Sequence, residues 1–297
     1  MTRLLLLTLF AVSLTAQEIA LTFDDLPNHG NLPPGVTRVD VARTFVAALK
    51  PASVEFYGFM NAGRADGDAA RNEVLRIWRD GGFPLASHSY SHMDLHGNNT
   101  EDFKRDIDQN EAALPQLMEG QNWKWFRYPY LREGDTVEKR REIRAYLKQK
   151  GYRTAQVTID FGDYMWNAPY ARCMANEDQQ AVEELKSLYL EAAEDSLDAG
   201  QELSRLLFDR DMKHTMLLHI GAFTGLMLPD LLELLDDLDF KVIPLAEAHS
   251  DTAYDSDPDV ATTRGETLLM QMALAKKLSY ARHPDDAYED QLDKFCR

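Results

Sequence analysis

Cysteine is scarce in this chain, with only Cys173 and Cys296 among 297 residues. Neither residue belongs to a Cys cluster of the kind that binds a metal, so a structural metal site built on cysteines is excluded. Two cysteines are the minimum for one disulfide, which an exported chain could form. The sequence alone leaves open whether these two residues meet.

Basic residues are in the minority. Lys and Arg number 32 against 49 Asp and Glu, which gives a formal net charge of −17 at pH 7. A surface of this sign repels phosphate backbones and anionic lipid. We therefore expect no nucleic-acid partner and no membrane-surface partner, and neutral or cationic substrates suit the charge better.

The chain begins with an apolar run, residues 4–14, that is too short to span a membrane. Arg3 precedes this run and Thr15-Ala16 follow it, a pattern typical of a secretion signal over residues 1–16. Leu14 is a weak point, because a small residue fits better three positions before the cleavage site. The alternative is a hydrophobic first strand. We favour the signal and expect a secreted or periplasmic protein with no membrane-spanning segment in the mature chain.

Internal repeats and low-complexity linkers are also lacking, which favours one catalytic domain over residues 17–250. Seven short strand-like segments alternate with helical ones, and this alternation demands parallel strands joined by crossover helices. The sequence therefore predicts an α/β fold with a barrel or a strongly curled sheet. The first strand begins at 18, and the others are expected at 53–59, 83–87, 123–128, 154–159, 215–220 and 240–245.

Helices are expected between these strands, with Thr37 and Thr100 as caps and a break near Gly200. An acidic extension, 251–297, should add one helix at 266–278 that packs on the outside. The helices of the main domain are predicted at 37–50, 68–80, 100–118, 135–150, 176–210 and 228–238.

Residues suited to chemistry follow the predicted strands. Asp24 and Asp25 end the first strand, and they can share one site only where the backbone turns, because successive strand residues point to opposite faces. His88 and His92 follow the third strand, and a spacing of four lets them bind one metal from a helical turn. His92 and His96 have the same spacing, but His88 lies directly at the strand end. With one Asp, the first pair would form a His₂Asp site for zinc, cobalt or nickel.

Other strand ends carry further candidates. Arg127, at the end of the fourth strand, could keep a carboxylate ionised and oriented, as a catalytic base needs. His219 ends the sixth strand, where a lone His is usually structural. A nearby Asp could instead keep its ring protonated and aimed as a general acid.

Five segments resemble, in order, the polysaccharide deacetylases, the carbohydrate esterases of the NodB-homology type. They are Thr22-Phe-Asp-Asp25, His88-Ser-Tyr-Ser-His92, Arg127-Tyr-Pro-Tyr130, Asp160-Phe-Gly-Asp-Tyr164 and Leu217-Leu-His219, and together they cover roughly residues 18–245. The resemblance implies a distorted (β/α)7 barrel, in agreement with the independent count of strands.

The resemblance also implies roles. The metal, usually zinc, would be bound by Asp25, His88 and His92. Asp24 would be the general base tethered by Arg127, and His219 the general acid tuned by Asp163. The backbone N–H of Tyr130 would help hold the oxyanion, and Tyr164 would form an apolar wall. The remaining residues expected at the substrate are His29, Pro129 and Trp166.

The activity implied is metal-dependent removal of N- or O-linked acetyl groups from a polysaccharide or oligosaccharide. The chain departs from the family at Leu26, where Gly is common, and after His219, where another His often follows. These departures put the substrate in doubt rather than the reaction. The alternatives are an amide, cyclic imide or formyl hydrolase acting on a small non-glycan substrate, and a carbohydrate-binding protein without catalysis.

Overall fold

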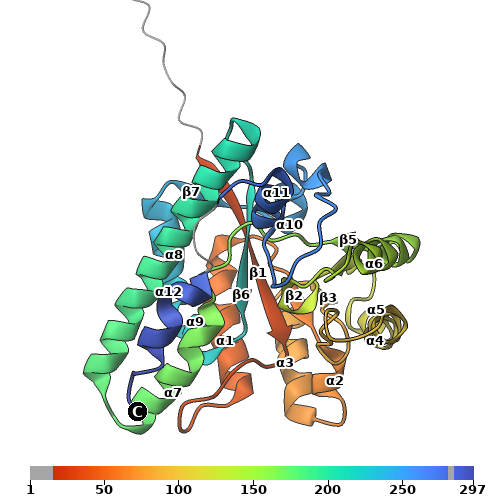
Figure 1. Cartoon of the computed structure of the whole chain (residues 1–297). Helices are drawn as coiled ribbons and strands as arrows, with labels where there is room; N and C mark the ends of the chain where they lie inside the picture. The colour runs from red at the N-terminus through yellow and green to blue at the C-terminus, as the bar shows by residue number, and fades with distance from the viewer. Residues whose placement is uncertain (1–15, 280–283) are drawn as a thin grey trace, which may run out of the picture.

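The computed structural model describes residues 16–279 and 284–297, so residues 1–15 of the expected signal lie outside the described residues. A parallel sheet with the order β5-β4-β3-β2-β1-β6 forms its centre (Figure 1). The strands are β1 (Gln17–Leu26), β2 (Gly58–Met60), β3 (Leu85–Ser87), β4 (Trp125–Phe126), β5 (Arg153–Thr154), β6 (His214–His219) and β7 (Phe240–Val242).

The sheet curls towards closure at β6. After β5 the chain returns to β6, where Ile159 forms a parallel bridge with Met216. Strand β7 pairs only with the first residues of β1, on the edge opposite to β6, since Ile19 pairs with both Val242 and His214. The result is the distorted, curled barrel of parallel strands that the sequence predicts.

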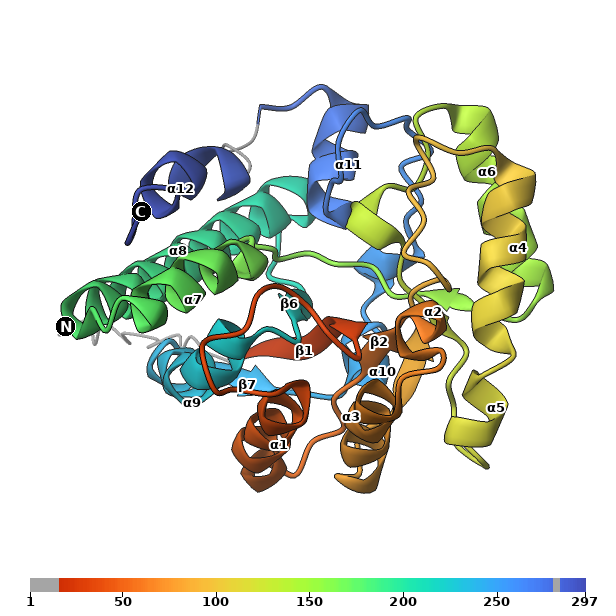
Figure 2. The same cartoon turned by 90° about the horizontal axis from the view of Figure 1, so that it is seen from below.

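Helices cover the outside of the sheet (Figures 1 and 2). The long crossover helices are α1 (Arg38–Leu49), α3 (Ala69–Asp80), α4 (Thr100–Glu111), α6 (Val137–Gln149), α8 (Gln179–Phe208) and α9 (Ala222–Asp237). The shorter ones are α2 (Ala62–Ala65), α5 (Leu114–Leu117), α7 (Asn167–Ala175) and α10 (Leu245–Ala248), with single turns η2 (Pro129–Leu131) and η3 (Asp163–Trp166).

Helix boundaries follow capping chemistry closely. Thr37 caps α1 in a reciprocal capping box with Asp40, as expected. The helix expected at 100–118 is capped by Asn99 rather than Thr100, and it is split into α4 and α5. Pro115 explains the split, because proline inside a helix removes a backbone donor and clashes with the preceding turn.

Gly200 does not break α8, contrary to the expectation. The helix runs without interruption from Gln179 to Phe208. A Cβ at Gly200 would lie 2.9 Å from Cγ1 of Ile159, so the glycine serves close packing of α8 on the sheet.

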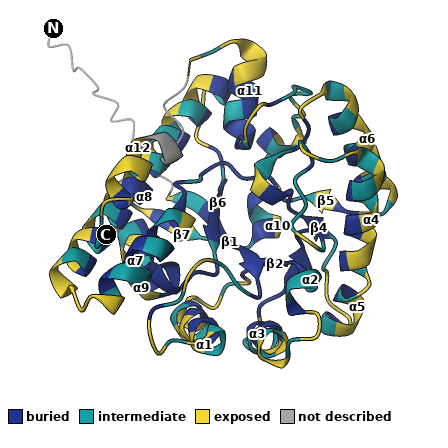
Figure 3. Cartoon of the chain, turned by 60° about the horizontal axis from the view of Figure 1, so that its bottom comes forward, coloured by how far each residue is buried: buried dark blue, intermediate teal, exposed yellow. Residues whose placement is uncertain are grey.

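The core lies between the strands and the surrounding helices, as Figure 3 shows by burial. The ring of Phe23 on β1 is fully buried and meets Phe45 of α1, Phe56 and Trp78 of α3 edge-on. This packing fixes the strand that carries the two aspartates.

In its described residues, the C-terminal extension holds two α-helices, α11 (Leu268–Lys276) and α12 (Pro284–Leu292), where the sequence predicts one. Cys173 of α7 forms a disulfide with Cys296, which ties the end of the chain to the barrel. Within the described residues, no helix has the length and apolar character needed to cross a bilayer.

Candidate active site

The two aspartates at the end of β1 enter one pocket because the strand is irregular there. The register of β1 against β2 shifts between Phe23 and Leu26, and Asp25 has a left-handed backbone with a φ of 71°. Such a bulge turns a side chain that would otherwise point to the opposite face. Both carboxylates are almost fully buried.

Arg127 holds Asp24 in place. Its Nη1 lies 3.2 Å from Oδ1 and 3.3 Å from Oδ2 of Asp24, while Nη2 donates to Thr22 and Nε to the carbonyl of Ala155. Burial raises the pKa of Asp24 to about 7, against the opposing effect of Arg127. A carboxyl with a pKa near neutrality and a fixed orientation is suited to act as a general base.

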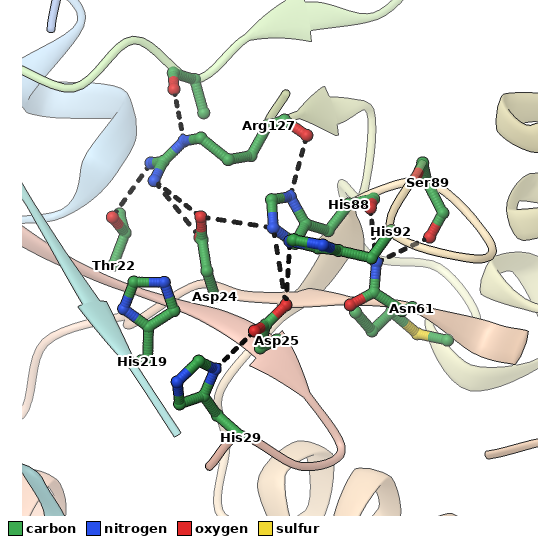
Figure 4. Close-up of polar contacts among 12 residues, drawn as sticks. Thr22, Asp24, Asp25, His29, Asn61, His88, Ser89, His92, Arg127 and His219 are labelled. Atoms are coloured by element: carbon green, nitrogen blue, oxygen red, sulfur yellow. Dashed lines mark hydrogen bonds and ion pairs between the residues drawn. The ribbon is translucent and has the colours of Figure 1, made fainter. Parts of the chain in front are cut away.

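Asp25, His88 and His92 converge on one point (Figure 4). The Nε2 atom of His92 lies 3.2 Å from Oδ1 of Asp25, and that of His88 lies 3.8 Å from it. The pair does not sit on a helical turn as expected, since residues 88–92 form an irregular loop in which Ser89 and His92 have positive φ. The loop conformation, rather than helical spacing, brings the two rings together.

The donor set fits a divalent metal. Oδ1 of Asp25 is buried and makes no hydrogen bond; its one arginine contact is an ion pair with Arg64, so the atom still has a lone pair to offer a metal. His88 directs its Nδ1 to the carbonyl of Arg127 at 2.9 Å, which leaves Nε2 with a lone pair facing Asp25. Burial lowers the pKa of His88 well below its usual value and that of His92 to about 4. Two neutral imidazoles and a carboxylate are ligands that zinc prefers.

Asp25 is in turn held by residues outside the histidine pair. His29 Nδ1 lies 2.5 Å from Oδ2, and Arg64 Nη1 lies 3.0 Å from Oδ1. Although burial alone raises it, the hydrogen bond from His29 and the positive groups around it hold the pKa of Asp25 well below its usual range. The loop that carries His29 is fixed by Arg38, whose guanidinium donates to the carbonyls of His29 and Gly30.

His29 therefore orients the carboxylate of Asp25, and we expect His29→Ala to weaken zinc binding by roughly 10- to 100-fold, the usual cost of losing a partner of a ligand. Competition with a chromophoric chelator measures this affinity without any activity assay. His96→Ala is the matched control, because Nε2 of His96 accepts from the Gly134 N–H and takes no part in the cluster. Equal zinc affinity in the His29 variant and the wild type would contradict this role.

His219 faces the pocket with Asp163 behind it. Nδ1 of His219 lies 2.7 Å from Oδ1 of Asp163, and Oδ2 accepts from the His219 backbone N–H and from Thr224. Burial alone lowers the pKa of His219, but the Asp163 carboxylate raises it to about 9. A charged imidazolium aimed by a buried carboxylate is suited to donate a proton from Nε2. Asp25, His29 and His219 form a second group of side chains close enough to share a metal. The hydrogen bond between Nδ1 of His219 and Asp163 instead favours His219 as a proton donor.

These groups line a pocket of about 320 Å³, within the size range of small-ligand sites. Tyr164 and Tyr130 form part of its wall, and both side chains are exposed. Pro129 is the buried first residue of the η2 turn, and Trp166 is fully buried against Phe161 and Tyr189. Neither residue lines the pocket, so the expected substrate contact of Pro129 and Trp166 is not supported.

Several pocket residues were not identified from the sequence. Arg64 reaches Asp25 from α2, a four-residue helix without a sequence signal. Arg264 and Gly265 come from the C-terminal extension, which was expected only to pack on the outside. The one usable signal was Arg264, a single basic residue in an otherwise acidic and neutral stretch from 251 to 275.

A parallel, curled barrel with a His₂Asp cluster and a buried Asp–Arg pair at the carboxyl ends of its strands defines a hydrolase-type site. Residues 11–155 match the sequence model of the polysaccharide deacetylase family. Over these residues the chain is similar to this family, as the sequence resemblance predicts.

Solved structures show the same fold. The chitin deacetylase of the fungal pathogen Colletotrichum lindemuthianum is 21% identical, with a TM-score of 0.56 over 79% of this chain and 88% of that one. The peptidoglycan deacetylase PdaC of Bacillus subtilis is 17% identical, with a TM-score of 0.52 over 79% and 91%. A pseudoenzyme of carbohydrate esterase family 4 from Bacillus anthracis is 14% identical, with a TM-score of 0.53 over 78% and 65%. Among curated protein sequences, none matches this chain.

Proposed function

We propose that this protein is an exported, metal-dependent deacetylase that removes acetyl groups from a glycan. The observation that carries the proposal is the separation of roles in one pocket: a metal-type cluster on Asp25, a tethered carboxylate at Asp24 and a carboxylate-backed imidazole at His219. In Figure 4, His219 and the His88–His92 pair lie on opposite sides of the two aspartates. A substrate placed between them would meet a base and an acid at once.

The chemistry follows from these positions. Asp24 accepts a proton from the attacking water while Arg127 keeps its carboxylate oriented. The negative charge that develops on the acetyl carbonyl oxygen as water attacks is stabilised by a hydrogen bond from the backbone N–H of Tyr130. His219 donates its Nε2 proton to the departing amine or sugar hydroxyl, and acetate is released. A divalent ion held by Asp25, His88 and His92 would supply Lewis-acid polarisation of the acetyl carbonyl and of water.

Export is supported by the signal-like residues 1–16 and by the Cys173–Cys296 disulfide, because disulfides persist in oxidising compartments. The family context and the export signal together favour an acetylated cell-wall or environmental glycan over a small amide, imide or formyl substrate. A pseudoenzyme is disfavoured, since each position needed for catalysis holds a competent residue in contact with its partner.

Metal removal tests the proposal. Treatment with a chelator should lower acetate release by on the order of 10²-fold or more, and zinc, cobalt or nickel should restore it. Acetate release is measured from acetylated chitooligosaccharides, acetylated xylan and peptidoglycan, with small amides and formyl compounds as the rival panel. Metal-loaded enzyme that releases no acetate from any glycan, but cleaves a member of the rival panel, would replace the proposal with that activity.

A further inference from the structure

The C-terminal extension reaches the active site through one segment, residues 257–267, which we call the strap. It runs between α10 and α11 and passes beside α6 (Figure 2). Arg264 and Gly265 of the strap line the catalytic pocket. The family match ends at residue 155, so the strap lies beyond the part of the chain that it covers.

Gly265 presses against the turn that bears the expected oxyanion donor. A Cβ at Gly265 would lie 1.8 Å from the carbonyl oxygen of Tyr130 and 3.4 Å from Cβ of Leu131. No larger residue fits there unless the backbone of Tyr130 moves. Gly265 itself is not in the left-handed region, so this glycine is required for the close approach and not for a turn.

The turn that Gly265 contacts is conformationally strained. Tyr130 and Leu131, two consecutive non-glycine residues, have φ values of 58° and 53°. Such conformations persist only where the surrounding structure enforces them. The ring of Tyr130 also packs on the outer side of the metal-type cluster, with its centroid 4.4 Å from that of His92.

The strap is anchored firmly enough to enforce that turn. Buried Glu133, two residues after Leu131, pairs with Arg144 at 2.5 Å and accepts from Gln271 of α11 at 2.9 Å. The same Gln271 amide donates to the carbonyl of Glu266 in the strap. Asp257, at the start of the strap, pairs with Arg140 and Arg144 of α6.

Backbone contacts complete the anchoring. The N–H of Thr262 donates to the carbonyl of Gly134, and that of Leu268 donates to Val157. The start of the strap is therefore bonded to α6, its middle to the loop that follows Tyr130, and the residue after its end to the segment after β5.

We propose that the strap is a positioning element of the active site, in which Gly265 sets the Tyr130–Leu131 turn so that the Tyr130 N–H and ring hold their places in the pocket. This inference rests on the proposed function for its kinetic consequence. The strap makes the residues after 250 part of the catalytic unit rather than an external addition.

Gly265→Ala tests the inference, because it inserts one methyl group at the contact. We expect kcat for deacetylation to fall by roughly 10- to 100-fold, because a small misplacement of groups near the reacting atoms slows the reaction by such factors. KM and zinc affinity should change by less than about twofold. Hydrogen–deuterium exchange at the Tyr130 and Leu131 amides should become faster. Gly97→Ala is the control, since its nearest neighbour to an added Cβ is 3.8 Å away and it lies in the loop next to His96.

Gln271→Met provides a second route, because it keeps the side-chain volume but removes the donor that joins Glu133 to the strap. It should change kcat and exchange in the same direction by a smaller factor. The inference fails if both variants keep wild-type kcat and wild-type exchange at residues 130–131, or if kcat falls while that exchange is unchanged. If wild-type protein deacetylates no glycan, the proposed function fails, and the exchange measurement still decides whether the strap holds the turn.

Discussion

Asp24→Asn should lower kcat for deacetylation by on the order of 10²–10⁴-fold, the usual contribution of a general base. Asparagine keeps the size of the side chain and an oxygen that can face Arg127, but it cannot accept the proton from water. Zinc affinity should stay close to wild type, because Asp25, His88 and His92 supply the ligand set. Acetate release with saturating zinc and chelator competition measure the two quantities separately.

The substitution also leaves Arg127 buried without its carboxylate, and breaking a buried pair costs about 3–5 kcal/mol of stability. Thermal unfolding must therefore show that the variant is folded at the assay temperature. Asp251→Asn is a matched control, since Asp251 also pairs with an arginine, Arg210, but far from the pocket residues in the fold. Full-rate turnover by zinc-loaded Asp24→Asn protein would remove Asp24 from the role of base.

The fold could be predicted because its determinants are local. Periodicity and turn residues give the order of strands and helices, and parallel strands joined by helices have few possible arrangements. The predicted boundaries of helices and strands were wrong where tertiary packing determines the backbone conformation. Gly200 looked like a helix break but accommodates Ile159. The expected strand 53–59 is β2, Gly58–Met60, and Ser53 instead has a left-handed backbone after a short turn.

The site could be predicted in part for a related reason. Residues at the carboxyl ends of parallel strands meet, so Asp24, Asp25, Arg127 and His219 could be placed together from their positions in the sequence. The histidine pair was anticipated for an incorrect reason, because positive φ at Ser89 and His92 replaces the helical turn.

Long-range contacts were beyond sequence reasoning. Arg64 contacts Asp25 across 39 positions of the chain, and Gly265 contacts Tyr130 across 135. The hydrophobic periodicity of these segments does not indicate either contact. Glycine in a tail predicts a turn or flexibility. Only the backbone of the strap shows that this glycine serves a close approach to the active site.

The two adjacent aspartates have opposite pKa shifts because their carboxylates contact different partners. Asp24 faces Arg127 inside the barrel, whereas the left-handed backbone of Asp25 turns its carboxylate to His29, Arg64 and His92. Burial raises the pKa of Asp24 to about 7, whereas at Asp25 the effect of burial is outweighed by the surrounding donors together, which lower its pKa. One residue is thereby suited to exchange a proton and the other to remain an ionised ligand.

His219→Ala should lower kcat on an N-acetyl substrate by on the order of 10²–10⁴-fold if His219 is the general acid. An amine is a poor leaving group and needs the proton that Nε2 of His219 would give. An activated aryl acetate releases a stable phenolate that needs no proton to depart, so its hydrolysis should fall far less. The ratio of the two losses separates acid catalysis from general damage to the pocket, which would lower both rates alike.

Asp163→Asn tests the role of His219 through the pH dependence of kcat. With the carboxylate present, the pKa of His219 is raised to about 9, so the acid form persists below that pH and is lost as pH rises through it. Without that carboxylate, burial is offset only by Asp25 and Asp24, so the pKa of His219 falls and the alkaline limb of the kcat profile should move to lower pH. Thr224→Val is the control, because it removes a hydrogen bond to Asp163 but keeps the carboxylate beside the ring. An alkaline limb that stays in place in Asp163→Asn, together with equal losses on amide and aryl ester in His219→Ala, would assign the proton donor to another group.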